Sequence, residues 1–182
     1  MRALILYGPP ASGKDTITDA LIRLSGNYEL FRRLKVGGGR TRTYRMTTSE
    51  RIAELDANDE ILWRNSRYDA TYVVDRPELS EMLNANKTPV LHLGQAEAIN
   101  AIRSSMSEVC WTTVELWCPR PIAEARIRAR QTNDTSARLV AWDATERIDP
   151  ACVDLRIDTA ELSPTASAAT IHHTVESKCS SM

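Results

Sequence analysis

The stretch Gly8-Pro-Pro-Ala-Ser-Gly-Lys-Asp15 directly follows the apolar run Ala3-Leu-Ile-Leu-Tyr7. An apolar strand, a glycine-containing turn and a lysine at the start of a helix form the context of a P-loop. In a P-loop, backbone N–H groups surround a phosphate chain, and the helix N-terminus adds partial positive charge. The lysine brings a mobile cation to the β- and γ-phosphates. The stretch therefore predicts a nucleoside triphosphate site; the plainer alternative is a surface turn that happens to carry a lysine.

We expect the triphosphate of ATP to contact the whole turn and the first residues of the helix after it. These residues are Gly8, Pro9, Pro10, Ala11, Ser12, Gly13, Lys14, Asp15 and Thr16. Asp15 stands where P-loops usually have Ser or Thr. Mg²⁺ keeps much of its hydration, so we expect the triphosphate, waters and Asp15 or Thr16 to hold it, Asp15 through a water. The alternative role for Asp15 is a carboxylate that the helix dipole stabilises.

Composition and charge describe an ordinary globular domain and exclude several partners. The chain has 182 residues, of which 42% are hydrophobic and 26% charged, and this suits one domain with a substantial core. A formal net charge of -1 gives no support for a nucleic-acid or membrane partner. The four cysteines (Cys110, Cys118, Cys152 and Cys179) lack metal-ligand spacing, so we expect free thiols in a cytoplasmic protein. Monomer and homodimer both stay open.

Strand-like and helix-like segments alternate along nearly the whole chain, which predicts an α/β fold. We expect a P-loop NTPase three-layer sandwich with a mostly parallel central sheet, as one domain over residues 1–182. The more polar segment 37–75 interrupts the alternation and is expected to form a small inserted acceptor-binding subdomain. We expect His92 to lie packed or hydrogen-bonded in the core, and the tail over 176–182 to be frayed.

Two arginine clusters favour phosphoryl transfer between small molecules, which needs a positioned acceptor and cations around the moving phosphoryl group. Arg42 and Arg45 could form a fork on one phosphate. Arg126 and Arg130 lie on the same face of an expected helix. Arg138 follows after a polar loop that could close as a lid. The plainer alternative for each cluster is a solvated basic surface.

At these motifs the chain resembles the guanylate-kinase-like family of small P-loop kinases, over nearly all of its length. The family's Thr-Arg-x-x-Arg acceptor clamp is matched by Thr41-Arg42-Thr-Tyr-Arg45. Its acceptor-contacting tyrosine is matched by Tyr68 in Arg67-Tyr-Asp-Ala-Thr71. The resemblance therefore implies acceptor binding by Arg42, Arg45 and Tyr68.

The lid of that family carries Arg-x-x-x-Arg, a polar turn and a further arginine. The matching residues here are Arg126, Arg130 and Arg138, within an expected lid over 126–138. The resemblance implies that these three arginines and Lys14 are catalytic, that ATP is the phosphoryl donor and that Mg²⁺ is the cofactor.

Several departures from guanylate kinases match a sister group, the ribose 1,5-bisphosphate phosphokinases. That group has Gly-Lys-Asp in its P-loop, as in Gly13-Lys14-Asp15, and a Trp before the tyrosine, as at Trp63. It also has a glycine where a Walker B acid would stand, as at Gly94. Asp69 replaces the glycine that follows the tyrosine in both groups.

We therefore expect an ATP-dependent phosphotransferase that acts on a phosphorylated small molecule of the nucleoside monophosphate type. One alternative is a kinase of ribose 1,5-bisphosphate or a related sugar phosphate. Another is a small-molecule hydroxyl kinase, with Asp69 as the carboxylate base. A third is an inactive interaction module. Trp63 is either an acceptor contact or a core residue, and Asp69 either an acceptor contact or a turn residue.

Overall fold

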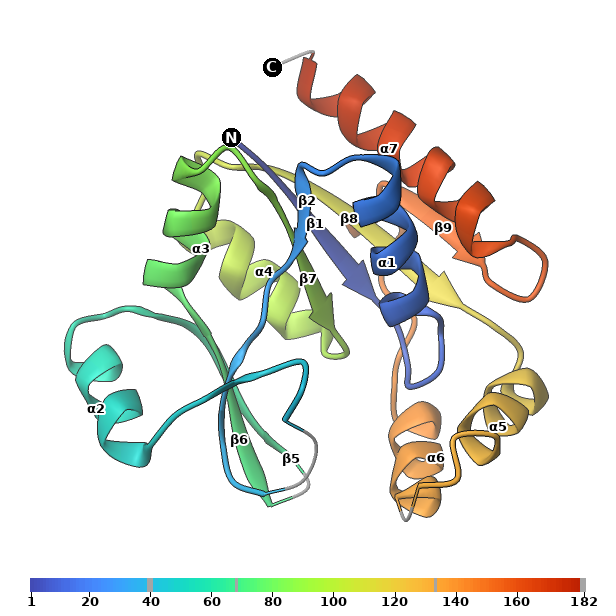
Figure 1. The fold of residues 1–182 in the computed structure, drawn as a ribbon, viewed down its shortest axis with the longest axis horizontal. Coiled ribbons are helices and arrows are strands. Elements are labelled where there is room, and N and C mark those ends of the chain that lie inside the picture. The colour runs from blue at the N-terminus through green and yellow to red at the C-terminus, as the bar shows by residue number, and fades with distance from the viewer. Residues whose placement is uncertain (39–40, 68, 133, 181–182) are drawn as a thin grey trace.

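A central sheet of parallel strands organises the molecule, as the alternation of segments predicts (Figure 1). The computed structural model describes residues 1–38, 41–67, 69–132 and 134–180. The strand order is β2-β7-β1-β8-β9, and every pairing is parallel. The strands are β1 (Arg2–Tyr7), β2 (Tyr28–Leu30), β7 (Thr88–Leu93), β8 (Cys110–Trp117) and β9 (Leu155–Asp158).

Helices cover both faces of this sheet, because both faces of β1 are apolar. Ala3, Ile5 and Tyr7 join the core cluster under α3 and α4, whereas Leu4 and Leu6 join the cluster under α1 and α7. The helices are α1 (Lys14–Leu24), α3 (Arg76–Asn84), α4 (Ala96–Ser105), α5 (Arg120–Arg128), α6 (Thr135–Asp143) and α7 (Pro164–Ser180), with a 3-10 turn at Pro150–Cys152. Among the described residues, none of these helices is long and apolar enough to cross a bilayer.

A second, smaller sheet lies within residues 34–75, in the order β4-β3-β6-β5, and so combines the segment 37–75 with β3. It contains β3 (Leu34–Val36), β4 (Arg45–Met46), β5 (Ile61–Arg67) and β6 (Ala70–Asp75), with α2 (Ser49–Ala57) packed on it. Its own small core consists of Leu34, Ile52, Leu55 and Val73. Residues 28–36 form two strands and not one, because β2 ends in the central sheet and β3 begins the smaller one.

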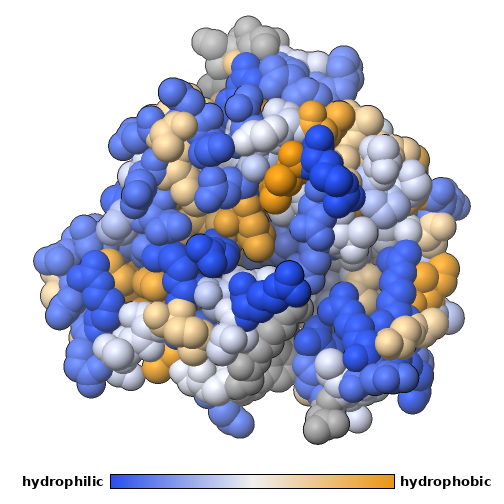
Figure 2. Space-filling view, viewed as in Figure 1, coloured by the Kyte–Doolittle hydropathy of each residue, from blue (hydrophilic) through white to orange (hydrophobic). Residues whose placement is uncertain are grey.

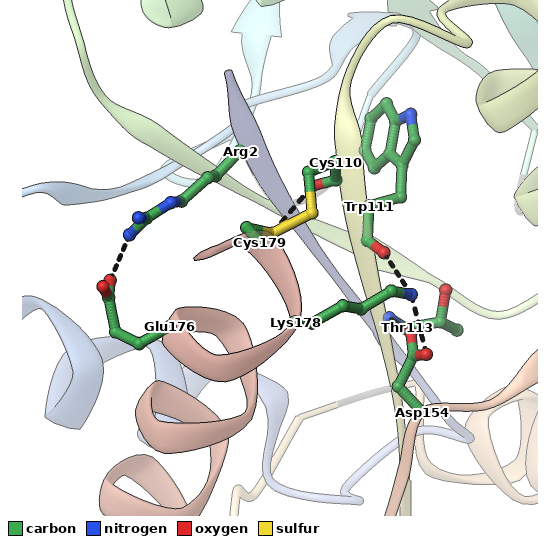
Figure 3. The surroundings of a disulfide bond; sticks show 8 residues. All are labelled: Arg2, Cys110, Trp111, Thr113, Asp154, Glu176, Lys178 and Cys179. Atoms are coloured by element: carbon green, nitrogen blue, oxygen red, sulfur yellow. Dashed lines mark hydrogen bonds and ion pairs between the residues drawn. A yellow bond between two sulfur atoms is a disulfide. The ribbon is translucent and has the colours of Figure 1, made fainter. Parts of the chain in front are cut away.

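The C-terminal helix is anchored at its last turn, where a frayed tail was expected (Figure 3). Cys179 forms a disulfide with Cys110 at the start of β8. Lys178 donates to the carbonyl oxygen of Trp111 at 2.8 Å and pairs with Asp154 at 2.7 Å. The expectation of four free thiols was thus wrong for two of them. The bridge joins residues 69 apart in sequence, and only the packing of α7 against the sheet brings them together.

We expect the Cys179→Ser variant to lose about 2–4 kcal/mol of unfolding free energy, because its unfolded chain is no longer cross-linked. Urea denaturation under oxidising conditions measures the difference. Dithiothreitol should lower the wild type to the stability of the variant and leave the variant unchanged. Cys152→Ser, at an unpaired and half-buried cysteine, is the matched control. Equal stability of wild type and Cys179→Ser would mean that the bridge does not form.

Candidate active site

A cavity of about 590 Å³ opens at the carboxyl ends of the parallel strands. Residues of the turn after β1 and of the end of β7 line it, as do residues of the smaller sheet and of the α5–α6 segment. Figure 2 shows hydrophilic side chains on both sides of the gap between these two parts. Crevices at the carboxyl ends of parallel strands are where open α/β sheets bind ligands. All of the predicted ATP contacts except Pro9 line this cavity.

The turn after β1 depends on two glycines with backbone angles that other residues rarely adopt. Gly8 has φ +154° and donates its N–H to the carbonyl oxygen of Leu93 at 3.2 Å. A Cβ at this position would lie 2.2 Å from the carbonyl oxygen of Leu116, so only glycine fits. Gly13, at φ +92°, is the N-cap of α1. The predicted strand, turn and helix are therefore present in the structure.

Lys14 lies folded against the turn that carries it. Its Nζ donates to the carbonyl oxygens of Gly8 at 2.6 Å and Pro9 at 2.8 Å, and to Ser12 Oγ at 3.2 Å. Burial, together with the nearby positive charge of Arg33, lowers the pKa of Lys14 to about 8, against the opposing effect of Asp15. A phosphate group that entered the turn could replace the two carbonyl oxygens as the partner of this ammonium group.

Asp15 and Thr16 place two oxygen ligands at the mouth of the turn. Both line the cavity, and the Asp15 side chain is 44% exposed. Carboxylate and hydroxyl oxygens suit a hydrated Mg²⁺. Among the described residues, no group of three or more His, Cys, Asp or Glu side chains could hold a metal ion. The donor set therefore fits a magnesium ion that is held largely by the triphosphate and waters.

Two of the three predicted lid arginines face the P-loop. Arg130 and Arg138 line the cavity, and with Asp15, Thr132 and Asp134 they line a second recess beside it. The Nε of Arg138 donates to Asp134 Oδ2 at 2.8 Å, and this hydrogen bond is the main reason that the pKa of Asp134 falls to about 2. These contacts hold Arg138 beside the cavity.

Arg126 has a different environment from the one predicted. One terminal nitrogen donates to the carbonyl oxygen of Ala11 at 3.2 Å and to Thr159 Oγ1 at 3.0 Å, and the other to the Thr159 carbonyl oxygen at 2.7 Å. Arg126 is not among the residues that line the cavity. It joins the P-loop to the residue that follows β9. It does not share the cavity lining with Arg130, because these hydrogen bonds hold its guanidinium group.

The expected fork of Arg42 and Arg45 is not formed. Arg42 is exposed and lies outside the cavity lining. Arg45 forms a very close ion pair with Asp75 and a second one with Glu78 at 3.4 Å. The Asp75 side chain makes no capping hydrogen bond to α3, although its sequence position predicts one. Arg45 therefore stabilises the junction between β4 and α3 and does not point into the cavity.

The remaining acceptor predictions have separate outcomes. Trp63 packs against the larger core cluster and does not line the cavity. Asp69 does line the cavity, in a turn where its φ of +54° is one that glycine would also adopt. Tyr68 lies outside the described residues. His92, expected in the core, lines the cavity beside Asp15.

Sequence reasoning missed a cationic group on the side of the cavity that the smaller sheet forms. Lys35 is only 2% exposed; its Nζ donates to the carbonyl oxygen of Gly38 and lies 5.4 Å and 5.6 Å from the ring centroids of Tyr44 and Tyr72. The Arg33 guanidinium lies 5.7 Å and 5.3 Å from the same two centroids. All four residues line the cavity. Arg33 and Lys35 are two residues apart around β3, a spacing that places side chains on one face of a strand and could have identified them.

Comparison with solved structures places this architecture among kinases. A guanylate kinase from Anaplasma phagocytophilum has a TM-score of 0.60 at 16% identity, over 97% of this chain and 85% of that one. The chain shares the fold of that structure, a mostly parallel central sheet with helices on both faces. A gluconokinase from Sinorhizobium meliloti 1021 (TM-score 0.57) and a sugar kinase from Janibacter sp. HTCC2649 (0.55) are also similar, each at 16% identity over 97% of this chain and 94% or 97% of theirs. No protein-family model and no curated protein sequence matches the chain.

We expect the affinity for ATP to fall as the pH rises through about 8. Burial disfavours the charged form of Lys14 and brings its pKa to about 8, so the free protein loses this proton at lower pH than an exposed lysine does. Binding then requires proton uptake, which weakens it by up to about tenfold per pH unit. Calorimetric titrations between about pH 7 and about pH 10 measure this slope. Lys14→Ala should bind weakly without the slope, and a flat wild-type profile would contradict the prediction.

Proposed function

We propose that the protein is an ATP-dependent phosphotransferase that moves the γ-phosphoryl group of ATP to a phosphorylated small molecule, such as a nucleoside monophosphate. One observation carries this proposal: a single cavity joins the Lys14 turn to the buried Lys35 and its tyrosine neighbours. The Lys14 turn suits a triphosphate, and Lys35 with the two tyrosines suits the anionic end of an acceptor.

The donor half combines backbone and side-chain charge. The N–H groups after Gly8 and the N-terminus of α1 favour a phosphate chain, and Lys14 supplies the cation for its outer phosphates. Arg130 and Arg138 are placed to offset the charge that develops on the transferred group. Mg²⁺ held near Asp15 and Thr16 would neutralise charge on the β- and γ-phosphate oxygens.

The acceptor half favours a phosphate ester. Lys35 is 2% exposed, and its ammonium group and the Arg33 guanidinium lie near the rings of the same two tyrosines, Tyr44 and Tyr72. Two cationic side chains on one wall of the cavity suit an anionic group. A phosphate oxygen is already anionic, so it could attack the γ-phosphorus without a general base. The bond from the γ-phosphorus to the β–γ bridging oxygen would break, and ADP would leave. Asp69 is not needed as a base in this reaction.

A sugar phosphate with a second anionic group is the other candidate acceptor. On the acceptor side, the described cavity-lining residues include three cationic side chains (Arg33, Lys35 and Arg67) and one carboxylate, Asp69. Asn65 adds an amide whose buried oxygen has no hydrogen-bond partner among the described residues. This excess of positive charge favours an acceptor that carries more than one phosphate.

We expect Lys14→Ala to abolish phosphoryl transfer while the fold is kept, because the variant lacks the cation at the outer phosphates. The assay is ADP release with Mg²⁺-ATP over a panel of nucleoside and deoxynucleoside monophosphates, ribose 1,5-bisphosphate, other sugar phosphates and unphosphorylated sugars. Lys87→Ala, at a lysine bonded to the Gly26 carbonyl oxygen outside the cavity, is the control. Full turnover by Lys14→Ala would refute the P-loop assignment, and turnover only with unphosphorylated acceptors would refute the acceptor class.

Acceptor binding at Lys35 and acceptor binding at the Arg42–Arg45 clamp predict different effects of substitutions on the KM for the acceptor. Lys35→Met should raise the KM for the acceptor by about tenfold to a hundredfold and leave the KM for ATP unchanged, because a charge-assisted hydrogen bond contributes about 1.5–3 kcal/mol. Arg42→Met should change neither constant by more than about twofold. Initial-rate measurements with both substrates varied distinguish the two sites. The reverse result, with Arg42→Met impaired and Lys35→Met normal, would restore the clamp predicted from the sequence.

A further inference from the structure

Two departures from the usual P-loop pattern meet in the structure. Asp15 replaces the expected Ser or Thr, and β7 ends at Leu93, where the stretch His92-Leu-Gly94 has no acidic residue. The Nδ1 atom of His92 lies 3.4 Å from Asp15 Oδ1, and its Nε2 lies 2.7 Å from Thr18 Oγ1. The His92 side chain is 15% exposed and lines the same cavity as Asp15.

The three side chains permit one arrangement of protons when His92 is neutral. A carboxylate only accepts hydrogen bonds, so Nδ1 is the donor toward Asp15. Nε2 then accepts a hydrogen bond from the Thr18 hydroxyl group. Thr18 is itself 1% exposed and one helical turn from Asp15, so it holds the far side of the imidazole in place.

We propose that His92 is a positioning residue that holds the Asp15 carboxylate at the mouth of the P-loop. Asp15 thereby orients the water shell of the magnesium ion that accompanies ATP. It does this from the start of α1, whereas a Walker B acid does it from the end of a strand. Mg²⁺ retains several waters, and outer carboxylates held by a second residue orient such shells. This inference rests on the proposed function, because it concerns the metal of the nucleotide complex.

Two substitutions of His92 separate this role from a purely structural one. The amide nitrogen of Asn occupies nearly the position of Nδ1, so His92→Asn keeps the donor toward Asp15 and loses Thr18. The side-chain amide of Gln reaches the position of Nε2. His92→Gln therefore keeps the hydrogen bond with Thr18 and loses the one with Asp15. A positioning role through Asp15 predicts that Asn is tolerated and Gln is not. A structural role through Thr18 predicts the opposite.

The experiment measures the dissociation constant of Mn²⁺ from the protein–ADP complex by electron paramagnetic resonance, without acceptor or turnover. His92→Gln and Asp15→Asn should each raise this constant by about tenfold, whereas His92→Asn should stay within about twofold of the wild type. The double variant Asp15→Asn/His92→Gln should bind Mn²⁺ no more weakly than Asp15→Asn alone, because the two residues act as one unit. His172→Gln is the matched control, since His172 bonds Tyr28 outside the cavity.

A wild-type constant for His92→Gln, equal losses for Gln and Asn, or additive losses in the double variant would each overturn the inference. If His92→Gln does not fold, Asp15→Asn is compared with Asp15→Asn/His92→Asn. Equal Mn²⁺ affinities support the inference, and a further loss overturns it. A wild type that binds ADP and Mn²⁺ while His92→Gln is unaffected refutes this inference alone. A wild type that binds neither refutes the proposed function as well.

Discussion

The close passage of the backbone at Gly8 is the constraint on which the site depends. Its N–H bonds the Leu93 carbonyl oxygen of β7, and its Cα lies against the Leu116 carbonyl oxygen of β8. The turn after β1 is therefore held between the ends of two neighbouring strands. The turn leads into α1 at Lys14, and the cavity opens where side chains from both strand ends and both sheets meet. A larger residue at this position would displace the turn and with it Lys14.

Positive charge is placed at both ends of one cavity and is held there by different means. Lys14 rests on carbonyl oxygens of its own turn, at the cost of a lowered pKa. Lys35 is buried beside two aromatic rings and bonds a carbonyl oxygen. Arg138 is held by Asp134 on the lid side. Anionic substrates entering from opposite sides would meet preorganised cations, which is the arrangement that phosphoryl transfer requires.

Predictions from the sequence succeeded where the determinant is local. The P-loop follows from a strand, two glycines and a helix within 24 residues, and each of these features is visible in the sequence. Predictions for arginine side chains failed where a residue distant in the sequence forms the hydrogen bond or ion pair. Asp75 captures Arg45 from 30 positions away, and Thr159 captures Arg126 from 33. An arginine motif specifies charge and spacing, but it does not specify which carboxylate or carbonyl will be nearest.

The sequence by itself determined the class of fold and the phosphate-binding turn, because hydrophobic periodicity and glycine conformations act over short stretches of chain. Only the tertiary structure decided which cationic side chains line the cavity on the side of the smaller sheet, and which side chain lies beside Asp15. His92 reaches Asp15 because β7 lies beside β1 in the sheet, and Lys35 meets Tyr72 because β3 pairs with β6. Strand order and register set these contacts, and they depend on pairings between residues far apart in the chain.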